Sequence, residues 1–292
     1  MRNQVGFSSQ CWIMAEAVCL WHLPPHPYQW ASARKSSSQA GAQSLNWSLK
    51  MSKVGTVIGV DGCKDGWFYV ELSEAGSSYG VVRHIDELLE RASKDTCILI
   101  DIPIGLIDKG DAWRQCDAEA RKLLGWPRLA SVFRPPVRPA LQEPNYQAAS
   151  ACNRRLSGKG LSKQAYAIAP KIQEVDDLLR RDSKARSIIR EVHPELCFWG
   201  LSGGQPMEFN KKTTKGFEER MAVLSRHYPE SQDLVEKAVV EFPRKRVAKD
   251  DIIDAMVAAV TGRMRSQWCT LPAEPQADAH RLPMEMVYVV AK

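Results

Sequence analysis

Short, continuous runs of apolar residues stand out against longer amphipathic segments in this chain. One run covers residues 56–60 and ends on Asp61, and another covers 97–100 and ends on Asp101. Uninterrupted apolar runs of this length, bounded by glycine or a charged residue, are typical of strands that are buried on both faces. The two runs therefore predict two buried strands, each of which closes on a carboxylate.

The segments around these two runs predict the rest of a sheet. Residues 67–72 and 79–85 have the composition of strands, and the short turn before 67 predicts a hairpin. Residues 86–92 predict a helix with acids in its first turn, where the helix dipole favours them. Further strands are expected at 187–193 and, as a final edge strand, at 284–290. This order predicts an α/β fold with a mixed sheet that is flanked by helices.

Three further segments have the periodicity of helices. Residues 110–185 predict a largely helical insertion, whose first helix spans 111–124. Residues 208–241 are charged and helical in pattern. The segment 249–260 starts a helix whose small residues, at 255, 258 and 259, would allow a close approach to the sheet.

A change in composition at about residue 50 divides the chain. Residues 1–50 contain many serines, several tryptophans and a single acid, Glu16. We predict that they are a disordered or artefactual extension and that the folded domain covers 51–292. A start that is rich in serine and poor in acids is also compatible with an organelle transit peptide.

Composition and charge restrict the function only coarsely. With 44% hydrophobic and 25% charged residues, the 292-residue chain has an ordinary globular composition. Its net charge of +6 is compatible with an anionic partner but does not identify one. The 8 cysteines are scattered without a Cys-x-x-Cys pair, which favours reduced thiols in a cytoplasmic protein. No apolar run is long enough to span a membrane.

Acidic residues recur at positions where metal ligands are expected. Asp61 and Asp101 end the two buried strands, and Asp251 and Asp254 share one face at the start of the last long helix. Two strands that close on carboxylates, with a third acidic group on a helix, indicate a metal site. Each acid also has a simpler explanation, because aspartate favours turns and caps helices. Glu195 follows the strand predicted at 187–193 and would either join this site or open a helix.

Basic residues are frequent in the insertion and are interleaved with aromatic residues. The candidates for phosphate contacts are Arg114, Arg121, Arg134 and Arg138, together with Lys215 after the insertion. Basic and aromatic side chains together favour a nucleic-acid partner, since they bind phosphates and stack on bases. A solvated helical face with ordinary core aromatics is the alternative, and Arg114, Asp117 and Arg121 would then form an internal ion-pair face.

The order of several motifs resembles a known family. They are Val60-Asp61-Gly62 with Gly66-Trp67, Ile100–Leu106, Arg114–Asp117 with Ala120-Arg121, Ser131–Phe133 with Arg138, Glu191–Glu195, and Asp250–Ala255. From about residue 56 to its end, the chain resembles the domain-of-unknown-function family 429 (DUF429), whose members are predicted nucleases of ribonuclease H-like fold. The wider fold resembles Holliday-junction resolvases, which carry an Asp on the first strand, an acid on the fourth and Asp-x-x-Asp-Ala on the last helix.

The resemblance implies a metal-dependent nuclease with Asp61, Asp101, Asp251 and Asp254 at the catalytic positions. We expect Asp61 to bridge a pair of Mg²⁺ or Mn²⁺ ions, since hard carboxylate oxygens suit these metals. Asp101 and Asp254 would then bind one ion each, and Asp251 and Glu195 are further candidates.

Two other functions remain open at this point. One is a phosphotransferase or ATPase of the related actin-like fold, which also places Asp-Gly after its first strand, as Asp61-Gly62 does here. The other is a nucleic-acid-binding module that has lost catalysis. The sequence leaves open whether the substrate is DNA, RNA or a nucleotide.

Overall fold

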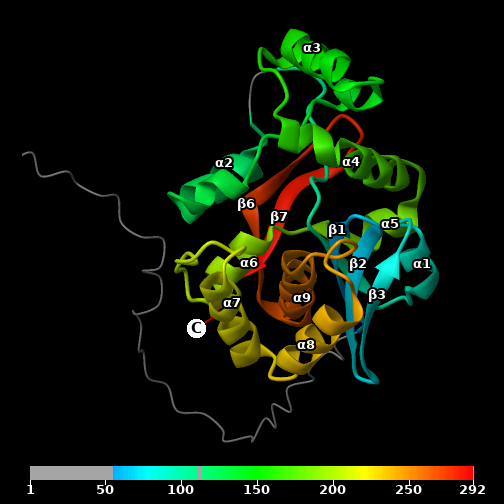
Figure 1. Ribbon diagram of the computed structural model, residues 1–292. Coiled ribbons are helices and arrows are strands. Elements are labelled where there is room, and N and C mark those ends of the chain that lie inside the picture. The colour runs from blue at the N-terminus through cyan, green and yellow to red at the C-terminus, as the bar shows by residue number, and fades with distance from the viewer. Residues whose placement is uncertain (1–54, 111–112, 292) are drawn as a thin grey trace, which may run out of the picture. The chain divides into compact units, whose positions relative to one another are not determined.

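A computed structural model describes residues 55–110 and 113–291, and the predicted extension at 1–50 lies outside this range. The main sheet has five strands in the order β3-β2-β1-β4-β5 (Figure 1). They are β1 (Val57–Cys63), β2 (Gly66–Ser73), β3 (Gly76–Val82), β4 (Cys97–Ile100) and β5 (Ile189–Glu191). Strands β1 to β3 form an antiparallel meander, and β4 and β5 run parallel to β1. The predicted mixed α/β sheet is therefore confirmed.

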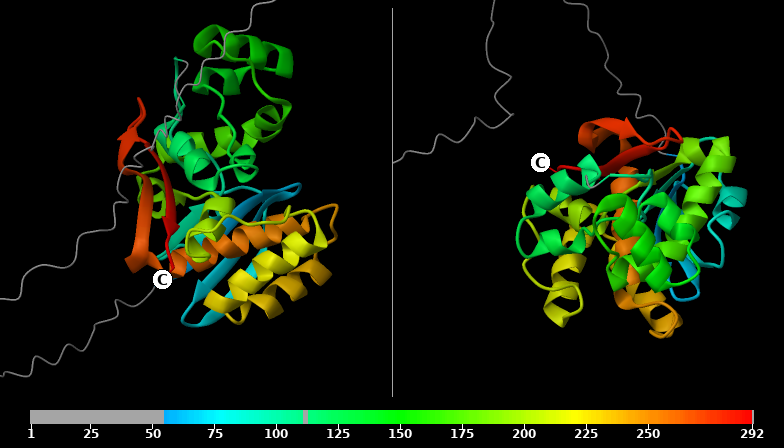
Figure 2. Two further views of the ribbon diagram at one scale, coloured as in Figure 1. Left: turned by 90° about the vertical axis from the view of Figure 1, so that its left-hand side faces the viewer. Right: turned by 90° about the horizontal axis from the view of Figure 1, so that it is seen from above.

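Helices cover both faces of this sheet, which explains why its strands are continuously apolar. One face packs on α1 (Glu87–Arg91), α4 (Lys163–Arg181) and α5 (Ser183–Ile188). The other packs on α6 (Pro194–Leu201), α7 (Thr214–His227), α8 (Ser231–Glu241) and α9 (Lys249–Arg263). Figure 2 shows α9 lying along the strands with α7 and α8 outside it. Successive residues of β2 alternate between the two cores, as the pleat of a strand requires.

Helix α9 lies unusually close to β1, as its small residues predict. A Cβ atom on Gly59 would lie 2.1 Å from the backbone oxygen of Ala255 and 2.3 Å from the backbone nitrogen of Ala259. A Cβ atom on Gly262 would lie 2.2 Å from the side chain of Val57. The start of β1 therefore lies beside the end of α9, so the end of β1 lies beside the start of α9.

In the described residues, the segment between β4 and β5 is largely helical. It contains α2 (Gln115–Leu124), α3 (Tyr146–Ser157), α4, α5 and two short 3-10 helices, η1 (Arg128–Ser131) and η2 (Arg138–Gln142). Figure 1 shows α2 and α3 beyond the end of the sheet that is opposite the β2–β3 turn. The insertion therefore borders the end at which β1 finishes.

The C-terminal strand pairs differently from the expected edge strand. β7 (Pro283–Val289) forms a separate antiparallel hairpin sheet with β6 (Trp268–Ala277), which follows the 3-10 helix η3 (Arg265–Gln267). It touches the main sheet through one parallel bridge, between Val192 and Val287. The sequence conceals β6 because prolines at 272 and 275 interrupt it, and proline is rare in paired strands. Among the described residues, no helix is both long and apolar enough to cross a membrane.

Candidate active site

The ends of β1 and β4 bring two aspartates together. Val60 pairs with Ile100 in the parallel register, so the residues that follow, Asp61 and Asp101, are neighbours at the same sheet edge. The backbone nitrogen of Asp101 donates to the oxygen of Val60 at 3.1 Å, which fixes this register. The Asp61 carboxylate accepts a 2.7 Å hydrogen bond from the nitrogen of Gly62. The expected meeting of two strand-end carboxylates is thus present in the structure.

Helix α9 supplies the third acid. Asp254 lies in the second turn of α9, and only 2% of its surface is exposed. Its Oδ2 accepts a 2.5 Å hydrogen bond from Nζ of Lys211, whereas its buried Oδ1 has no hydrogen-bond partner among the described residues. We call Asp61, Asp101 and Asp254 the aspartate cluster. Asp251, one turn earlier, accepts a 2.8 Å bond from the nitrogen of Ala248 and so also caps the helix.

Burial and neighbouring acids raise the pKa values of the aspartate cluster. Burial raises the pKa of Asp61 well above its usual value, and the charges of Asp101, Asp254 and Asp251 raise it further. Burial and Asp254 together raise the pKa of Asp101 to about 8. Burial also raises the pKa of Asp254, despite the nearby Lys211 ammonium. The carboxylates are therefore close enough to interact strongly and are only partly neutralised.

Lys211 is the cation of this site, and it lies in the turn between α6 and α7. Burial alone lowers its pKa, but the charges of Asp254, Asp61 and Asp101 outweigh that effect and raise it. The sequence gives no sign of this role for Lys211, because its acidic partners are distant along the chain. A positive charge therefore already lies where a metal cation is expected.

Glu195 lies at the margin of the aspartate cluster. It occupies the first turn of α6, and its Oε1 accepts a 2.5 Å hydrogen bond from the buried Arg220. Its other oxygen, Oε2, is buried without a partner in the described residues. The charge of Glu195 raises the pKa values of Asp101 and Asp254, so it lies close to both. Both sequence-based expectations for Glu195, helix opening and proximity to the acids, describe its position.

Glu191 is a strand-end acid that the sequence did not single out. It ends β5 beside Ile100, and its two oxygens accept 2.8 Å bonds from Arg114. Asp117 accepts bonds of 2.9 and 2.5 Å from the same guanidinium. We call Arg114, Asp117 and Glu191 the arginine network. The strand was expected to continue to 193, but β5 ends at 191. The sequence therefore did not show that Glu191 is the residue at the end of the strand.

A comparison of the sequence with models of known protein families gives one match. The model of a family described as "Protein of unknown function (DUF429)" matches residues 59–277. The chain belongs to this family. No curated protein and no solved structure matched the chain. The aspartate cluster, Lys211 and the arginine network all lie inside the matched range.

Two of the arginines expected to contact phosphates are buried within this DUF429 domain. Arg114 is 3% exposed and Arg138 is 6% exposed. Arg138 donates to Asp176 at 3.0 Å and to Asp108 at 3.0 Å, and it also pairs with Asp278. Both guanidinium groups therefore face carboxylates of the protein itself, instead of a surface on which a phosphate could lie.

The other three basic candidates are more accessible. Arg121 donates to the backbone oxygens of η1 and of the following residue at 2.7 Å, and it lies over the Trp113 ring. Arg134 donates to the oxygen of Gly110 at 3.2 Å. Lys215 is exposed in the first turn of α7, with its ammonium over the Phe209 ring. These three side chains are partly or fully open to solvent, so a nucleic-acid surface is compatible with them but is not identified by them.

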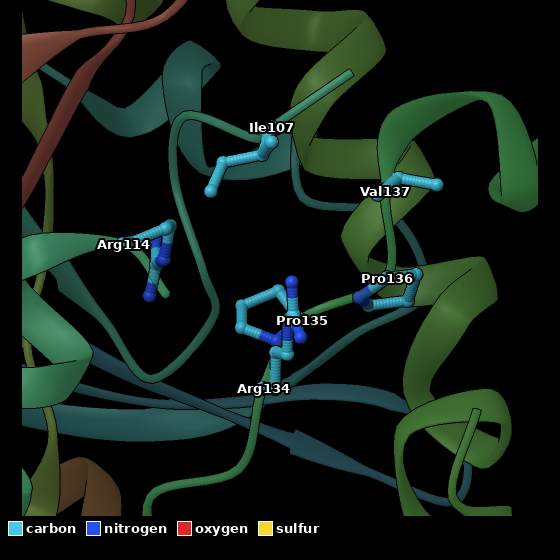
Figure 3. Close-up of a pocket in the computed structure, with 6 residues that line it drawn as sticks. All are labelled: Ile107, Arg114, Arg134, Pro135, Pro136 and Val137. Atoms are coloured by element: carbon cyan, nitrogen blue, oxygen red, sulfur yellow. The ribbon is translucent and has the colours of Figure 1, made fainter. Parts of the chain in front are cut away.

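A small pocket beside the proline-rich loop does not include the aspartate cluster. Figure 3 shows its lining residues, which are Ile107, Arg114, Arg134, Pro135, Pro136 and Val137. Arg114 enters from the start of α2, and Arg134 comes from the facing loop. The charge of Arg114 is already matched within the arginine network, so this pocket supplies no chemistry of its own.

The ligand atoms that the acids of the site offer are of the kind that binds a hard divalent cation. All of them are carboxylate oxygens, which Mg²⁺ and Mn²⁺ prefer. The partnerless Oδ1 of Asp254 is a buried acceptor that a cation would satisfy. In the described part of the chain, however, no three acidic, histidine or cysteine side chains are already arranged around one ion position. An ion would therefore have to draw the carboxylates toward it.

Proposed function

We propose that this DUF429 protein hydrolyses phosphodiester bonds of nucleic acid with a divalent cation held by Asp61, Asp101 and Asp254. The observation that carries the proposal is the buried, partnerless Oδ1 of Asp254 beside two further aspartates whose pKa values are raised. An uncompensated group of buried acids destabilises a fold, so it is typical of a site whose ligand supplies the missing charge.

The arrangement of elements supports a ribonuclease H-like architecture for this proposal. The resemblance requires acids on the first strand, on the fourth strand and at the start of the last helix. Asp61 lies in β1, Asp101 follows β4, and Asp254 lies near the start of α9. The antiparallel meander followed by two parallel strands holds the first two at one edge.

Each residue would have a distinct task in the reaction. Asp61, Asp101 and Asp254 would hold an Mg²⁺ or Mn²⁺ ion, which when bound would supply Lewis-acid activation of a water molecule and of a phosphoryl oxygen. Asp61 lies between β4 and α9, so it is placed to hold the ion together with either neighbour. Asp251 keeps its capping bond to Ala248 and would position the first turn of α9. Glu195 has one free oxygen and would accept a proton or orient a water molecule.

The proposal is tested with purified protein and labelled single-stranded DNA, duplex DNA, RNA and a branched junction. We expect Mg²⁺- or Mn²⁺-dependent cleavage of at least one substrate, with loss of cleavage in EDTA and in Asp61→Asn. Asp177→Asn, at an aspartate of α4 whose side chain is 44% exposed and pairs with Arg180, is the matched control and should cleave like the wild type. Failure of the folded wild-type protein to cleave any of these substrates with either metal would overturn the proposal.

A further inference from the structure

Lys211 interacts with the four aspartates of the site. Its Nζ contacts Oδ2 of Asp254 at 2.5 Å. Its charge also lowers the pKa values of Asp61 and Asp101, and that of Asp251, against the larger effect of burial. The ammonium therefore lies against Asp254, and its charge acts on the other aspartates.

The turn that carries Lys211 is held rigidly on α7. The carboxylate of Glu219 accepts bonds from the backbone nitrogens of residues 208 and 209, at 2.6 and 3.0 Å. The buried Arg220 donates to the oxygen of Phe209 at 3.1 Å and also binds Glu195. A Cβ atom on Gly216 would lie 2.0 Å from the oxygen of Asn210, so the turn lies directly against the helix. The backbone that leads into Lys211 is thus bound to α7, and this packing brings the lysine to the acids.

The charges of the site favour one additional divalent ion over two. When ionised, the aspartate cluster carries three negative charges. Lys211 and one divalent ion supply three positive charges, which match this cluster; Asp251, whose carboxylate caps α9, is outside the count. The ammonium also occupies one of the two oxygens of Asp254, which leaves only Oδ1 for a metal.

We propose that the Lys211 ammonium is a built-in cation of this site, so that the aspartate cluster binds one divalent ion instead of a pair. This inference rests on the proposed metal-dependent function and specifies how the metal is held. Lys211 replaces the charge of the second ion, and the bound ion uses the free oxygen of Asp254 together with Asp61 and Asp101.

The number of bound Mn²⁺ ions tests the inference without measuring activity. Calorimetric titration and electron paramagnetic resonance count bound Mn²⁺ in the full-length protein. We expect one ion per chain in the wild type and two in Lys211→Met and Lys211→Gln, which lack the ammonium. Lys211→Arg keeps the charge and should bind one. Lys212→Met removes an exposed neighbouring charge of the same turn and should also bind one.

The wild-type count decides the inference even if a neutral variant fails to fold. Two ions in the wild type, or equal counts in the wild type and Lys211→Met, would overturn it and leave the nuclease proposal intact. No saturable Mn²⁺ binding in the wild type would overturn both. The expected number of bound Mn²⁺ ions per chain doubles in Lys211→Met and stays the same in the Lys212→Met control.

Discussion

Two groups of buried acids lie at the same end of the five-stranded sheet, and they are neutralised differently. In the arginine network, Glu191 uses both oxygens to accept bonds from one guanidinium, and Oε2 also accepts from the nitrogen of Ile104 at 2.6 Å. In the aspartate cluster, the charge of one lysine is shared by several acids. One oxygen of Asp254 has no hydrogen-bond partner in the described residues. Both groups arise because parallel strands end on acids, so strand-end position alone does not separate structure from function.

The difference lies in how the cost of burial is offset. Bidentate pairing with arginine, with further hydrogen bonds, offsets much of the cost of burying a carboxylate, although burial still raises the pKa of Glu191 to about 7. The aspartate cluster keeps an uncompensated electrostatic cost, which a ligand of opposite charge would remove. Neutralising an acid should therefore have opposite consequences in the two groups.

The largest effect is expected from breaking the arginine network. Arg114→Met leaves Asp117 and Glu191 buried without their shared cation. Removal of one partner from a buried ion pair costs about 3–5 kcal/mol in unfolding free energy. The midpoint of urea unfolding, measured with and without Mg²⁺, should fall in both conditions.

Lys122→Met, on the exposed face of α2, is the matched control. It should leave the unfolding free energy within about 0.5 kcal/mol of the wild type. A loss below about 1 kcal/mol in Arg114→Met would remove the contrast between the two groups. It would mean that the arginine network contributes no more to stability than an exposed pair does.

The next largest effect is expected from metal binding to the aspartate cluster. At a Mg²⁺ concentration of 100 times Kd, binding stabilises the native protein by about 2.7 kcal/mol. The melting temperature of the wild type should then rise by about 5–10 °C. Asp61→Asn should respond much less, and without metal it should be at least as stable as the wild type, because a repulsive charge is gone. An equal response of both proteins to Mg²⁺ would remove Asp61 from the site.

A smaller effect is expected from pH in EDTA. The pKa of Asp101 is about 8 in the folded protein, above that of an unfolded aspartate, because burial and Asp254 oppose ionisation. Between about pH 4 and pH 8 the unfolded chain gives up a proton that the native protein retains. The native state is therefore most favoured below this window and loses stability as the pH rises through it.

Thermal melts in EDTA from pH 5 to pH 8 measure this loss. Between pH 6 and pH 8 the wild type should lose about 2 kcal/mol more than Asp101→Asn, which has no proton to release at this position. Saturating Mg²⁺ should reduce the difference, since a bound cation favours the ionised carboxylate. Identical pH profiles of the wild type and Asp101→Asn in EDTA would show that Asp101 is not held in the protonated form.

The sequence predicts the aspartate cluster because its signals are local. A buried strand that ends on Asp61, another that ends on Asp101, and a helix that starts with Asp251 and Asp254 each lie within a few residues. The sheet register and the close packing of Gly59 on α9 then bring them together. The mixed sheet follows from the same local patterns.

The sequence does not predict which basic residues are internal, because their partners are distant. Arg114 and Glu191 are 77 residues apart in the chain, and Arg138 and Asp278 are 140 residues apart. No local pattern distinguishes such an arginine from one that faces a phosphate. The position of Lys211 among the acids was missed for the same reason, since Asp254 lies 43 residues away.

The smallest effect is expected from replacing Lys215. Its side chain is exposed, so it is accessible to a phosphate. It lies four residues after Lys211 in the chain, in the first turn of α7. If it contacts nucleic acid, Lys215→Ala should weaken binding to all sequences alike and reduce the slope of log K against log salt by about one. Lys94→Ala removes an exposed charge just before β4, at the far end of the sheet, and should leave the slope unchanged. Fluorescence anisotropy with labelled DNA and RNA at several salt concentrations measures both variants. The same slope in Lys215→Ala and Lys94→Ala would confine the role of Lys215 to its contact with Phe209.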